Sequence, residues 1–524
     1  MTAENNPAIL QHEVADWIES AFGVLRESAW TMSAYFHGID CLDALRQVFF
    51  MDLLELARAF DAPPHRSSIG PWKRLRSWGF QGKELWEEWQ TVRLARNRPL
   101  PTSVLLWPRH STHVKMLVPI ARALRERGVA CEFLSSLPRI WEILRAAEEP
   151  SGFTPAIWPG EIKAARADGR RMAGTLPLDL KVSLPDFVRP VPQEALRQCL
   201  HRTFRRWLPA LYETIVATER ALDELRPRVL VVGNDLTFEG RAQCLVASKR
   251  AISTACPMHG LAFGPLQRDH RTDCVLAFGE RSRRDLIRLG VPPDRIAICG
   301  APYLMGRSRQ TGQTNPAIAR FLELQPRQPW VLVATSGAGH SVSAAHHQQI
   351  VDALAAESAA NRGVRFAVKL HLKDTLEYYT EAQRKFPNAH WSIVGAKTQG
   401  VPQDIFAWLQ GPAAVLTCAS TVGMEAILLK IPVISMDFAD ELKDVDYIES
   451  GASLHVTNRS ELHAAIQRVL NEPQSLGDVR ERMAAYLRDC FEAIDGDAAG
   501  LTAEKVCQLG GISFVQKNAP AEMQ

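Results

Sequence analysis

The sequence predicts an α/β protein made of two Rossmann-like domains that face a cleft, with a helical extension at the N-terminus. Short apolar runs alternate with helix-like segments in two successive series, the pattern that builds parallel sheets. Residues 306–328, which include Gly306, Gly312 and Pro316, separate the two series as a linker. Ahead of the first series, residues 1–100 carry apolar residues at spacings of three and four, which is typical of helices.

Bulk composition is that of an ordinary globular protein. The 524 residues are 46% hydrophobic and 23% charged, enough for roughly two to four domains with sizeable cores. The formal net charge of +3 lacks the basic bias of nucleic-acid binders, so we expect no nucleic-acid partner. The ten cysteines include no CxxC pair and fit reduced thiols. With no signal-peptide pattern and no apolar run long enough for a membrane span, we expect a cytoplasmic protein.

The helical extension contains a basic, tryptophan-rich stretch at residues 71–89. It reads Pro71-Trp-Lys-Arg-Leu-Arg-Ser-Trp-Gly-Phe80, with Trp86 and Trp89 behind it. Two interpretations are open. The stretch would either contact the inner face of the plasma membrane, with Lys and Arg on anionic lipid and Trp among the headgroups, or pack the helices against the first domain.

The first Rossmann-like domain is predicted over residues 101–305 and the second over residues 329–495. In the first, Val104-Leu-Leu-Trp107 is a short strand suited to burial on both faces, and a helix and a second strand follow it. The second domain repeats this alternation from Trp330 onward. Residues 496–524 are expected to form a C-terminal tail with a frayed end.

The segment Thr417-Cys-Ala-Ser-Thr-Val-Gly-Met-Glu425 marks a change from strand to helix. Ser420 and Thr421 stand at the predicted N-cap, where backbone N–H groups and the helix dipole favour a phosphate. Gly423 would let a ligand approach the backbone, and Glu425 could accept hydrogen bonds from a ribose diol. The same residues would also suit a purely structural helix, with Ser and Thr as caps and Glu425 as a first-turn carboxylate.

Two further strand ends in the second domain carry polar residues. Lys369 and His371 alternate in Val368-Lys-Leu-His-Leu-Lys373, so they share one face of a strand, where a cation and an imidazole suit phosphate. Ser336 and Gly337 lie in a glycine-containing turn after the first strand of the domain. Because the carboxyl ends of parallel strands line the ligand crevice of open sheets, the sequence predicts a nucleotide-donor site here.

Three polar loops follow strands of the first domain. His259 precedes a glycine at a strand end, and the imidazole of histidine titrates near neutrality, so it is our first candidate for a general base. Asp235 is the second candidate, and His110 lies in the first strand-to-helix loop. Arg109 and His113 share that loop and are expected to bind the acceptor. A lone histidine is also commonly structural, and the three loops together favour a functional interpretation.

Taken in order, these elements resemble GT-B glycosyltransferases over about residues 102–495. The resemblance is carried by Pro257-Met-His-Gly260, Gly300-Ala-Pro302, Lys369-Leu-His371 and Ser420-Thr-Val-Gly-Met-Glu-Ala426. The nearest likeness is to bacterial enzymes of capsule polysaccharide and teichoic-acid type, among them the CDP-glycerol glycerophosphotransferase-like group and the Kdo transferases of capsule export. His259 and His371 match histidines that are important for chemistry in that group. Leu372 stands where the group usually has proline, which leaves the subfamily open.

The resemblance implies a metal-independent glycosyltransferase with no bound cofactor. It would move a sugar, or a polyol phosphate, from a CMP-, CDP- or UDP-linked donor to a saccharide or lipid-linked acceptor in bacterial surface polysaccharide or glycoconjugate synthesis. In GT-B enzymes the Ser-Thr-x-Gly-x-Glu segment binds donor phosphate and ribose, which implies this role for Ser420, Thr421 and Glu425.

Two other classes stay open. A non-hydrolysing sugar-nucleotide 2-epimerase uses the same fold but needs a pair of acid and base carboxylates, which the sequence does not identify. A non-catalytic nucleotide-sugar-binding or scaffold protein would carry a degenerate site.

Overall fold

The computed structural model divides the chain into two compact units. The N-terminal unit comprises Leu10–Tyr303 and Asp495–Gln524, and the C-terminal unit comprises Leu304–Ile494 with Met1–Ile9. No helix of the described residues is long and apolar enough to cross a membrane. The structure describes residues 7–27, 35–61, 100–175, 191–258, 260, 265–305, 313–338, 342–371, 374–396, 398–418, 420–442, 445–493 and 496–514. The stretch 71–89 therefore lies outside the described residues.

A seven-stranded, fully parallel sheet forms the centre of the N-terminal unit. Its order is β5-β4-β3-β6-β7-β8-β9, so the chain changes direction across the sheet between β3 and β6. Such a switch point is where open α/β sheets bind ligands. The strands are β3 (Val104–Trp107), β4 (Cys131–Ser135), β5 (Ser151–Phe153), β6 (Val229–Val232), β7 (Ser253–Pro257), β8 (Cys274–Ala277) and β9 (Ile296–Ile298).

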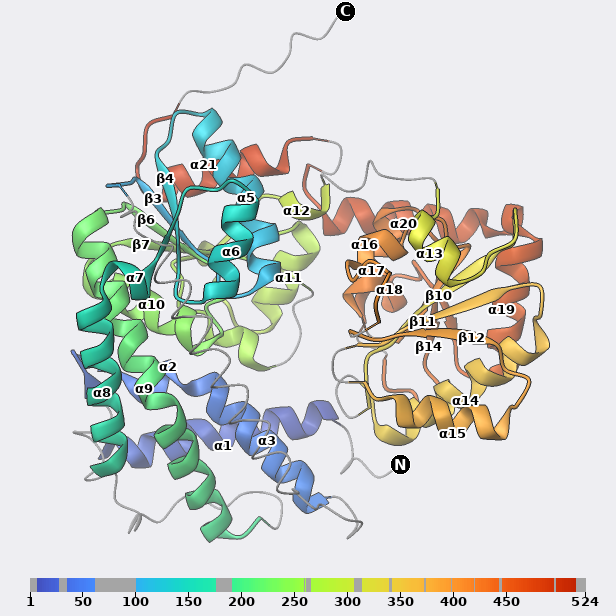
Figure 1. Cartoon of the computed structure of the whole chain (residues 1–524), viewed down its shortest axis with the longest axis horizontal. Coiled ribbons are helices and arrows are strands. Elements are labelled where there is room, and N and C mark those ends of the chain that lie inside the picture. The colour runs from blue at the N-terminus through green and yellow to red at the C-terminus, as the bar shows by residue number, and fades with distance from the viewer. Residues whose placement is uncertain are drawn as a thin grey trace, which may run out of the picture. The chain divides into compact units, whose positions relative to one another are not determined.

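Helices lie on both sides of this sheet (Figure 1). Every residue of β3 and β6 is buried, which explains why their sequences are continuous apolar runs rather than alternating ones. The main helices are α5 (Ser111–Glu126), α6 (Pro138–Ala146), α7 (Thr154–Ile157), α8 (Pro159–Thr175), α9 (Gln193–Leu225), α10 (Phe238–Lys249), α11 (Glu280–Arg288) and α12 (Pro302–Met305).

The first helices of the chain share the core of this unit. They are α1 (Pro7–Glu27), α2 (Cys41–Ala44) and α3 (Arg46–Asp61). A short hairpin of two strands, β1 (Tyr35–Phe36) and β2 (Ile39–Asp40), lies between α1 and α2. Phe22 and Phe49 lie edge to face with ring centroids 5.2 Å apart, in one apolar cluster with Phe204 of α9 and Leu105 of β3. The described part of the N-terminal extension is thus continuous with the first Rossmann-like domain.

A buried charge cluster fixes these helices to the sheet. The Asp43 Oδ1 atom of α2 accepts hydrogen bonds from Arg241 of α10, at 2.6 Å from Nη2 and 3.1 Å from Nε, and from Arg271 Nη2 at 3.1 Å. Arg241 is only 1% exposed. Arg46 of α3 pairs with Glu19 and lies 3.6 Å from Asp269 Oδ2. These pairs bind the N-terminal helices to the segment that precedes β8.

We expect Asp43→Ala to destabilise the N-terminal unit strongly. The substitution leaves the buried Arg241 guanidinium without its carboxylate, which typically costs roughly 3–5 kcal/mol. Urea unfolding measures the change. Asp168→Ala is the matched control, because its partner Arg171 is exposed, and such pairs contribute about 0–1 kcal/mol. Equal urea midpoints for the two variants would contradict the prediction.

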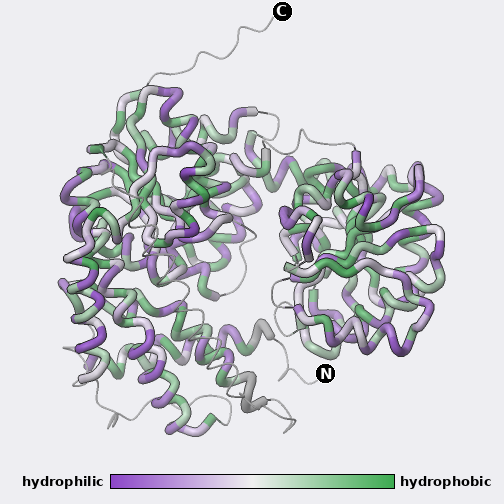
Figure 2. Tube along the Cα trace, in the orientation of Figure 1, coloured by the Kyte–Doolittle hydropathy of each residue, from purple (hydrophilic) through white to green (hydrophobic). Residues whose placement is uncertain are grey.

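The C-terminal unit has a six-stranded parallel sheet of order β12-β11-β10-β13-β14-β15. The chain changes direction between β10 and β13. Figure 2 shows the middle of this sheet as mostly hydrophobic. The strands are β10 (Trp330–Ala334), β11 (Arg365–Lys369), β12 (Trp391–Val394), β13 (Ala414–Thr417), β14 (Val433–Met436) and β15 (Leu454–Val456). The two parallel sheets confirm the predicted pair of Rossmann-like domains.

Helices again flank the strands of this sheet (Figure 1). They are α13 (Pro316–Phe321), α14 (Ala344–Ala360), α15 (Leu376–Lys385), α16 (Ile405–Trp408), α17 (Thr421–Leu428), α18 (Asp446–Glu449), α19 (Arg459–Asn471) and α20 (Gly477–Cys490).

The last helix of the described residues belongs to the N-terminal unit. The sequence predicts a tail from residue 496, whereas the structure forms α21 (Ala498–Leu509), which packs against α5 (Figure 1). Ala503, Val506 and Cys507 are fully buried in the cluster that α5 shares with the sheet. Their spacing of three and four makes one apolar helix face, which is stable only when another element covers it.

We expect Val506→Asp to weaken the N-terminal unit by roughly 3–5 kcal/mol, because it places a carboxylate in an apolar core. Gln508→Asp, on the exposed side of the same helix, should change stability little. Thermal unfolding of both variants tests this, and a Val506→Asp protein that melts with the control would show that α21 does not contribute to the core.

Candidate functional site

The carboxyl edge of the C-terminal sheet gathers the residues predicted to bind a nucleotide donor. Ala334 of β10 is in register with Lys369 of β11 on one side and with Thr417 of β13 on the other. Thr417 Oγ1 donates a hydrogen bond to the carbonyl oxygen of Ala334 over 3.0 Å. Because all these strands are parallel, Ser336–Gly337, His371 and Ser420–Thr421 leave the sheet at this same edge.

The N-terminus of α17 is held by Tyr447 of α18. The Ser420 N–H donates to the Tyr447 hydroxyl at 3.1 Å, and that hydroxyl lies 2.8 Å from the Cys418 carbonyl oxygen. A side chain on Gly423 would place its Cβ 2.7 Å from the tyrosine ring, so this glycine accommodates Tyr447. The N–H groups of Val422 and Gly423 already bond to Ser420. Several backbone N–H groups at this helix terminus therefore already have partners within the protein, which the sequence does not indicate.

Lys369 is a half-buried cation at this edge. Its Nζ lies 5.9 Å from the centroid of the Trp408 ring, within range of a cation–π interaction. Burial lowers the pKa of Lys369, and Asp404 opposes the shift. A bound phosphate would restore the preference for the charged form. Glu425, one turn into α17, is buried.

Two buried histidine–carboxylate pairs support the loops of this edge. His347 Nε2 lies 3.2 Å from Asp374 Oδ1, and Tyr379 donates to Asp374 Oδ2 at 2.7 Å. His346 Nδ1 lies 3.1 Å from Glu441 Oε2, while its Nε2 accepts from the Phe438 N–H. Because Nε2 accepts, Nδ1 carries the ring proton and donates to Glu441. The sequence reasoning missed both pairs, since these histidines lie at the start of α14 rather than at a strand end.

We expect Lys369→Met to weaken nucleotide binding roughly 10- to 100-fold, the equivalent of one charge-assisted hydrogen bond. In the unchanged protein, affinity should fall as pH rises through the lowered pKa of Lys369, below its usual value near 10.5, because only the ammonium form attracts phosphate. Calorimetric titration with CMP, CDP and UDP from pH 7 to 10 measures both effects. Lys385→Met, on the same unit at an exposed helix, is the control. Equal nucleotide affinities in the two variants would show that Lys369 does not bind the nucleotide.

In the N-terminal unit, the loops after β3 and β6 meet at an ion pair. Arg109 Nη2 lies 2.7 Å from Glu239 Oε1, at the start of α10. Burial raises the pKa of Glu239, and Arg109 opposes that shift. His110 is exposed, with Nδ1 3.5 Å from Thr112 Oγ1. The sequence analysis missed Glu239, which lies in a helix rather than in a loop.

His113 lies in the interior of the unit. It is buried, and its Nδ1 accepts a hydrogen bond from the Arg109 backbone N–H at 3.2 Å. A Cβ on Gly233 would come within 2.2 Å of the His113 ring, so only glycine fits there. His113 therefore joins the loops after β3 and β6 and fixes the shape of the switch point.

Asp235 is fully buried, and its two carboxylate oxygens are surrounded by hydrogen-bond donors. Oδ1 lies 2.6 Å from His270 Nδ1, and Oδ2 accepts from the N–H groups of Arg271 and Thr272 and from the Thr272 hydroxyl. Burial alone would raise the pKa of Asp235, but His270 and the two backbone N–H groups hold it well below its usual value. The carboxylate is ionised and has no surface open to a ligand.

A small hollow with polar and apolar walls lies beside this pair. His270, which the sequence reasoning missed, is one of its walls. The residues that line it are Asn234, Leu236, Cys256, Pro257, Met258, Gly260, Gln267, His270 and Val275. His259, the first candidate for a general base, lies outside the described residues.

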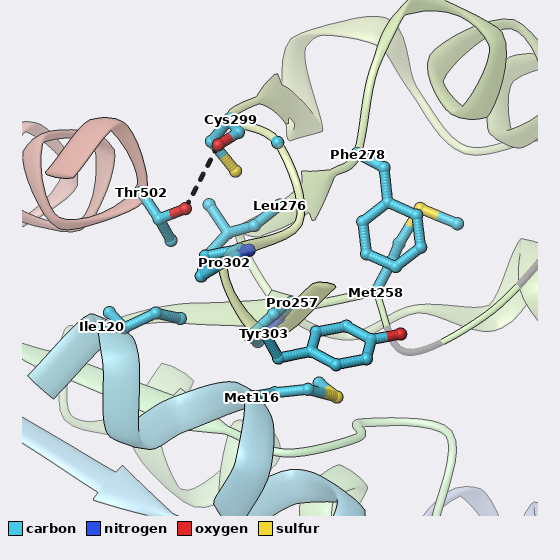
Figure 3. Close-up of a pocket in the computed structure, with 11 residues that line it drawn as sticks. Met116, Ile120, Pro257, Met258, Leu276, Phe278, Cys299, Pro302, Tyr303 and Thr502 are labelled. Carbon is cyan, nitrogen blue, oxygen red and sulfur yellow. Dashed lines mark hydrogen bonds between the residues drawn. The ribbon is translucent and has the colours of Figure 1, made fainter. Parts of the chain in front are cut away.

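A second, smaller and apolar hollow shares Pro257 and Met258 with the first. Figure 3 shows Met116 of α5, Met258, Phe278 and Tyr303 around it. Thr502 of α21 donates to the Cys299 carbonyl oxygen at 3.3 Å and closes one side. The end of β7 thus separates a hollow with polar and apolar walls from a purely apolar one. Among the described residues, no group of three or more His, Cys, Asp or Glu side chains could hold a metal ion.

These features define an open α/β protein of two Rossmann-like units, each with polar side chains at its switch point. Comparison with solved structures agrees with that fold. A UDP-N-acetylglucosamine 2-epimerase is 13% identical, covers 81% of this chain and 100% of its own, and has a TM-score of 0.51. The UDP-GlcNAc 2-epimerase of Neisseria meningitidis, bound to UDP-GlcNAc, is 12% identical over 78% of this chain and 98% of its own, with a TM-score of 0.50.

At such identities the likeness establishes the fold, which is GT-B-like. No family model and no curated protein sequence matches the chain. The finer resemblance to capsule and Kdo enzymes stays a prediction.

Proposed function

We propose that this protein is a sugar-nucleotide-processing enzyme that binds the nucleotide at the carboxyl edge of its C-terminal sheet. The observation that carries the proposal is the row of Lys369, Ala334 and Thr417 across β11, β10 and β13, with α17 beginning directly behind it. This row coincides with the switch point, where open sheets bind ligands. A phosphate there would meet the Lys369 ammonium, the Thr421 hydroxyl and the positive end of α17.

The proposed reaction is transfer of the activated group to a hydroxyl. Lys369, His371 and the helix terminus would stabilise the negative charge that develops on the departing phosphate. The positions of Asp235 and Glu239, which come directly after β6, favour transfer over epimerisation, because epimerisation needs carboxylates that face the sugar. Asp235 is closed off by four hydrogen-bond donors, and Glu239 is paired with Arg109. Neither is placed as a carboxylate open to a sugar.

Epimerisation of a nucleotide sugar is the second candidate. It is favoured by the comparisons, since the neighbours described above are UDP-GlcNAc 2-epimerases. The Neisseria structure holds UDP-GlcNAc, which makes UDP the first nucleotide to test among CMP, CDP and UDP.

The acceptor would be a saccharide or lipid-linked hydroxyl compound of bacterial surface polysaccharide or glycoconjugate synthesis. Polar and apolar side chains that lie next to one another in the N-terminal unit suit a molecule with a hydroxyl beside a non-polar part. Contact of residues 71–89 with the inner face of the plasma membrane would bring such a molecule near.

Thermal unfolding with CMP, CDP, UDP and GDP tests the nucleotide site. A ligand at 100 times its Kd should add about 2.7 kcal/mol to the free energy of unfolding. We expect one nucleotide to stand out and its effect to shrink in Lys369→Met but not in Lys385→Met. Absence of any shift in the unchanged protein would overturn the proposal.

The matching nucleotide sugar then separates the two reactions. Incubated alone and followed by NMR, it should keep its sugar configuration if the enzyme is a transferase, and release nucleotide faster when octyl glycosides are added as acceptors. Formation of the 2-epimer without acceptor would instead establish the second candidate.

A further inference from the structure

The buried pair of Asp235 and His270 has the arrangement of a catalytic base and the residue that orients it. We infer that His270 takes the proton from the attacking hydroxyl, and that the polar wall of the hollow formed by His270, Gln267 and Asn234 is the subsite for that hydroxyl. The inference rests on the proposed function, and it identifies the residues that would bind and deprotonate the acceptor.

The contact with Asp235 fixes where His270 carries a proton. Asp235 is ionised, so it can only accept, and the short 2.6 Å contact requires that His270 Nδ1 carries a proton. Nε2, on the other side of the ring, is then the nitrogen that can exchange a proton with a substrate. A base whose far nitrogen is fixed by a buried carboxylate is the arrangement that general-base catalysis requires.

Asp235 itself is not placed to act as the base. Its carboxylate is completely buried and accepts from His270, from two backbone N–H groups and from the Thr272 hydroxyl. These bonds stabilise the ionised form and block access to substrate. Asp235 is therefore a positioning residue, and the group that reaches the hollow is the His270 ring.

The partner of Nε2 supports a proton-transfer role. Gln267 Oε1 lies 3.1 Å from Nε2, and both residues line the hollow. As placed, the Gln267 oxygen accepts a hydrogen bond from a protonated Nε2, and a half-turn of the amide brings its NH₂ group to an unprotonated Nε2. Gln267 thus suits His270 before and after it takes a proton, whereas a carboxylate or an ammonium in that place would favour one state only.

The backbone around His270 is held rigidly by charged groups. Arg295 Nη2 donates to the His270 carbonyl oxygen at 2.9 Å, and Arg271 reaches Asp43 on the other side. Arg241 donates to the carbonyl oxygen of Asp269. These arginines and Asp235 surround the backbone segment that carries His270. The arginines bond mainly to backbone oxygens of this segment and to Asp43. A rigid segment keeps Nε2 in one direction, which proton transfer in a fixed geometry requires.

The step balances without further reactants. The hydroxyl oxygen bonds to the donor atom that carries the nucleotide, as the O–H bond breaks and its proton passes to His270 Nε2. The bond from that donor atom to the nucleotide's phosphate oxygen breaks at the same time, and its electron pair leaves with the nucleotide. His270 Nδ1–H continues to donate to Asp235, which stabilises the imidazolium.

Chemical modification tests the pair without knowledge of the natural acceptor. Diethylpyrocarbonate acylates a histidine nitrogen that has a free lone pair, and peptide mass mapping locates the product. We expect His270 to be modified, with the half-exposed His37 as reference and the fully buried His346 as the unreactive control. Glycerol, used as a hydroxyl probe, should slow modification of His270 but not of His37.

Asp235→Asn should cut the rate at His270 at least several-fold, because the amide no longer enforces the Nδ1–H tautomer. An unreactive His270 in the unchanged protein, or an equal rate in Asp235→Asn, overturns the inference. Circular dichroism and melting confirm that the variants are folded.

Turnover provides the second measurement. With the donor found above, His270→Gln should lose roughly 10²–10⁴-fold in kcat, the usual contribution of a general base, while nucleotide affinity stays unchanged and His37→Gln keeps full activity. Near-normal turnover of His270→Gln overturns the inference and leaves the nucleotide site intact. Absence of a nucleotide site in the unchanged protein defeats the proposed function instead, while the modification result still decides the state of His270.

Discussion

Parallel pairing of every strand in both large sheets is the constraint from which the rest of this structure follows. A parallel strand can be reached only by a crossover that returns the chain to the starting edge, so all strand-to-helix loops collect at the opposite edge. That is why Lys369 and Thr417, far apart in sequence, flank Ala334 in one row. The polar side chains of each unit gather for the same topological reason.

Charge buried near those edges is handled by pairing. Asp235 with His270, Asp374 with His347 and Glu441 with His346 bring an acceptor and a donor together largely away from water. Glu239 is buried beside the part-exposed Arg109. An unpaired charge in these places would cost several kcal/mol, about half of the stability of a typical domain. The pairs therefore fix the loops that carry the candidate sites, which leaves those loops preorganised for a ligand.

Elements from both ends of the chain complete the N-terminal unit. Helices α1 to α3 extend its core, and Asp43 binds the two arginines that hold the segment before β8. Helix α21 covers α5 and contributes Thr502 to the wall of the apolar hollow. The unit that carries His270 thus depends on residues from the beginning and the end of the chain.

Much of this architecture is readable in the sequence. Buried central strands must be continuous apolar runs, so the run Val104–Trp107 is enough to predict the first strand of the N-terminal sheet. Strand ends in parallel sheets carry polar loops, which located Asp235 and the Ser420–Thr421 cap. The helical periodicity of residues 498–509 is also present in the sequence, but a short apolar face does not reveal which surface covers it.

The roles of individual polar residues were not readable in this way. Gly423 indicates close approach of some group, yet only the packed structure shows that the group is the Tyr447 ring. His270 does not directly follow a predicted strand, so the pattern of polar residues at strand ends does not point to it. It lies shortly before β8 instead.

The sequence by itself determined two series of strands and helices and the edges at which polar residues appear, because strand burial and helix periodicity are local patterns. Only the tertiary structure decided that His270 meets Asp235, 35 residues away, and that this carboxylate is enclosed rather than open to a substrate. Such pairings depend on how separate segments pack over the sheet, which no local pattern encodes.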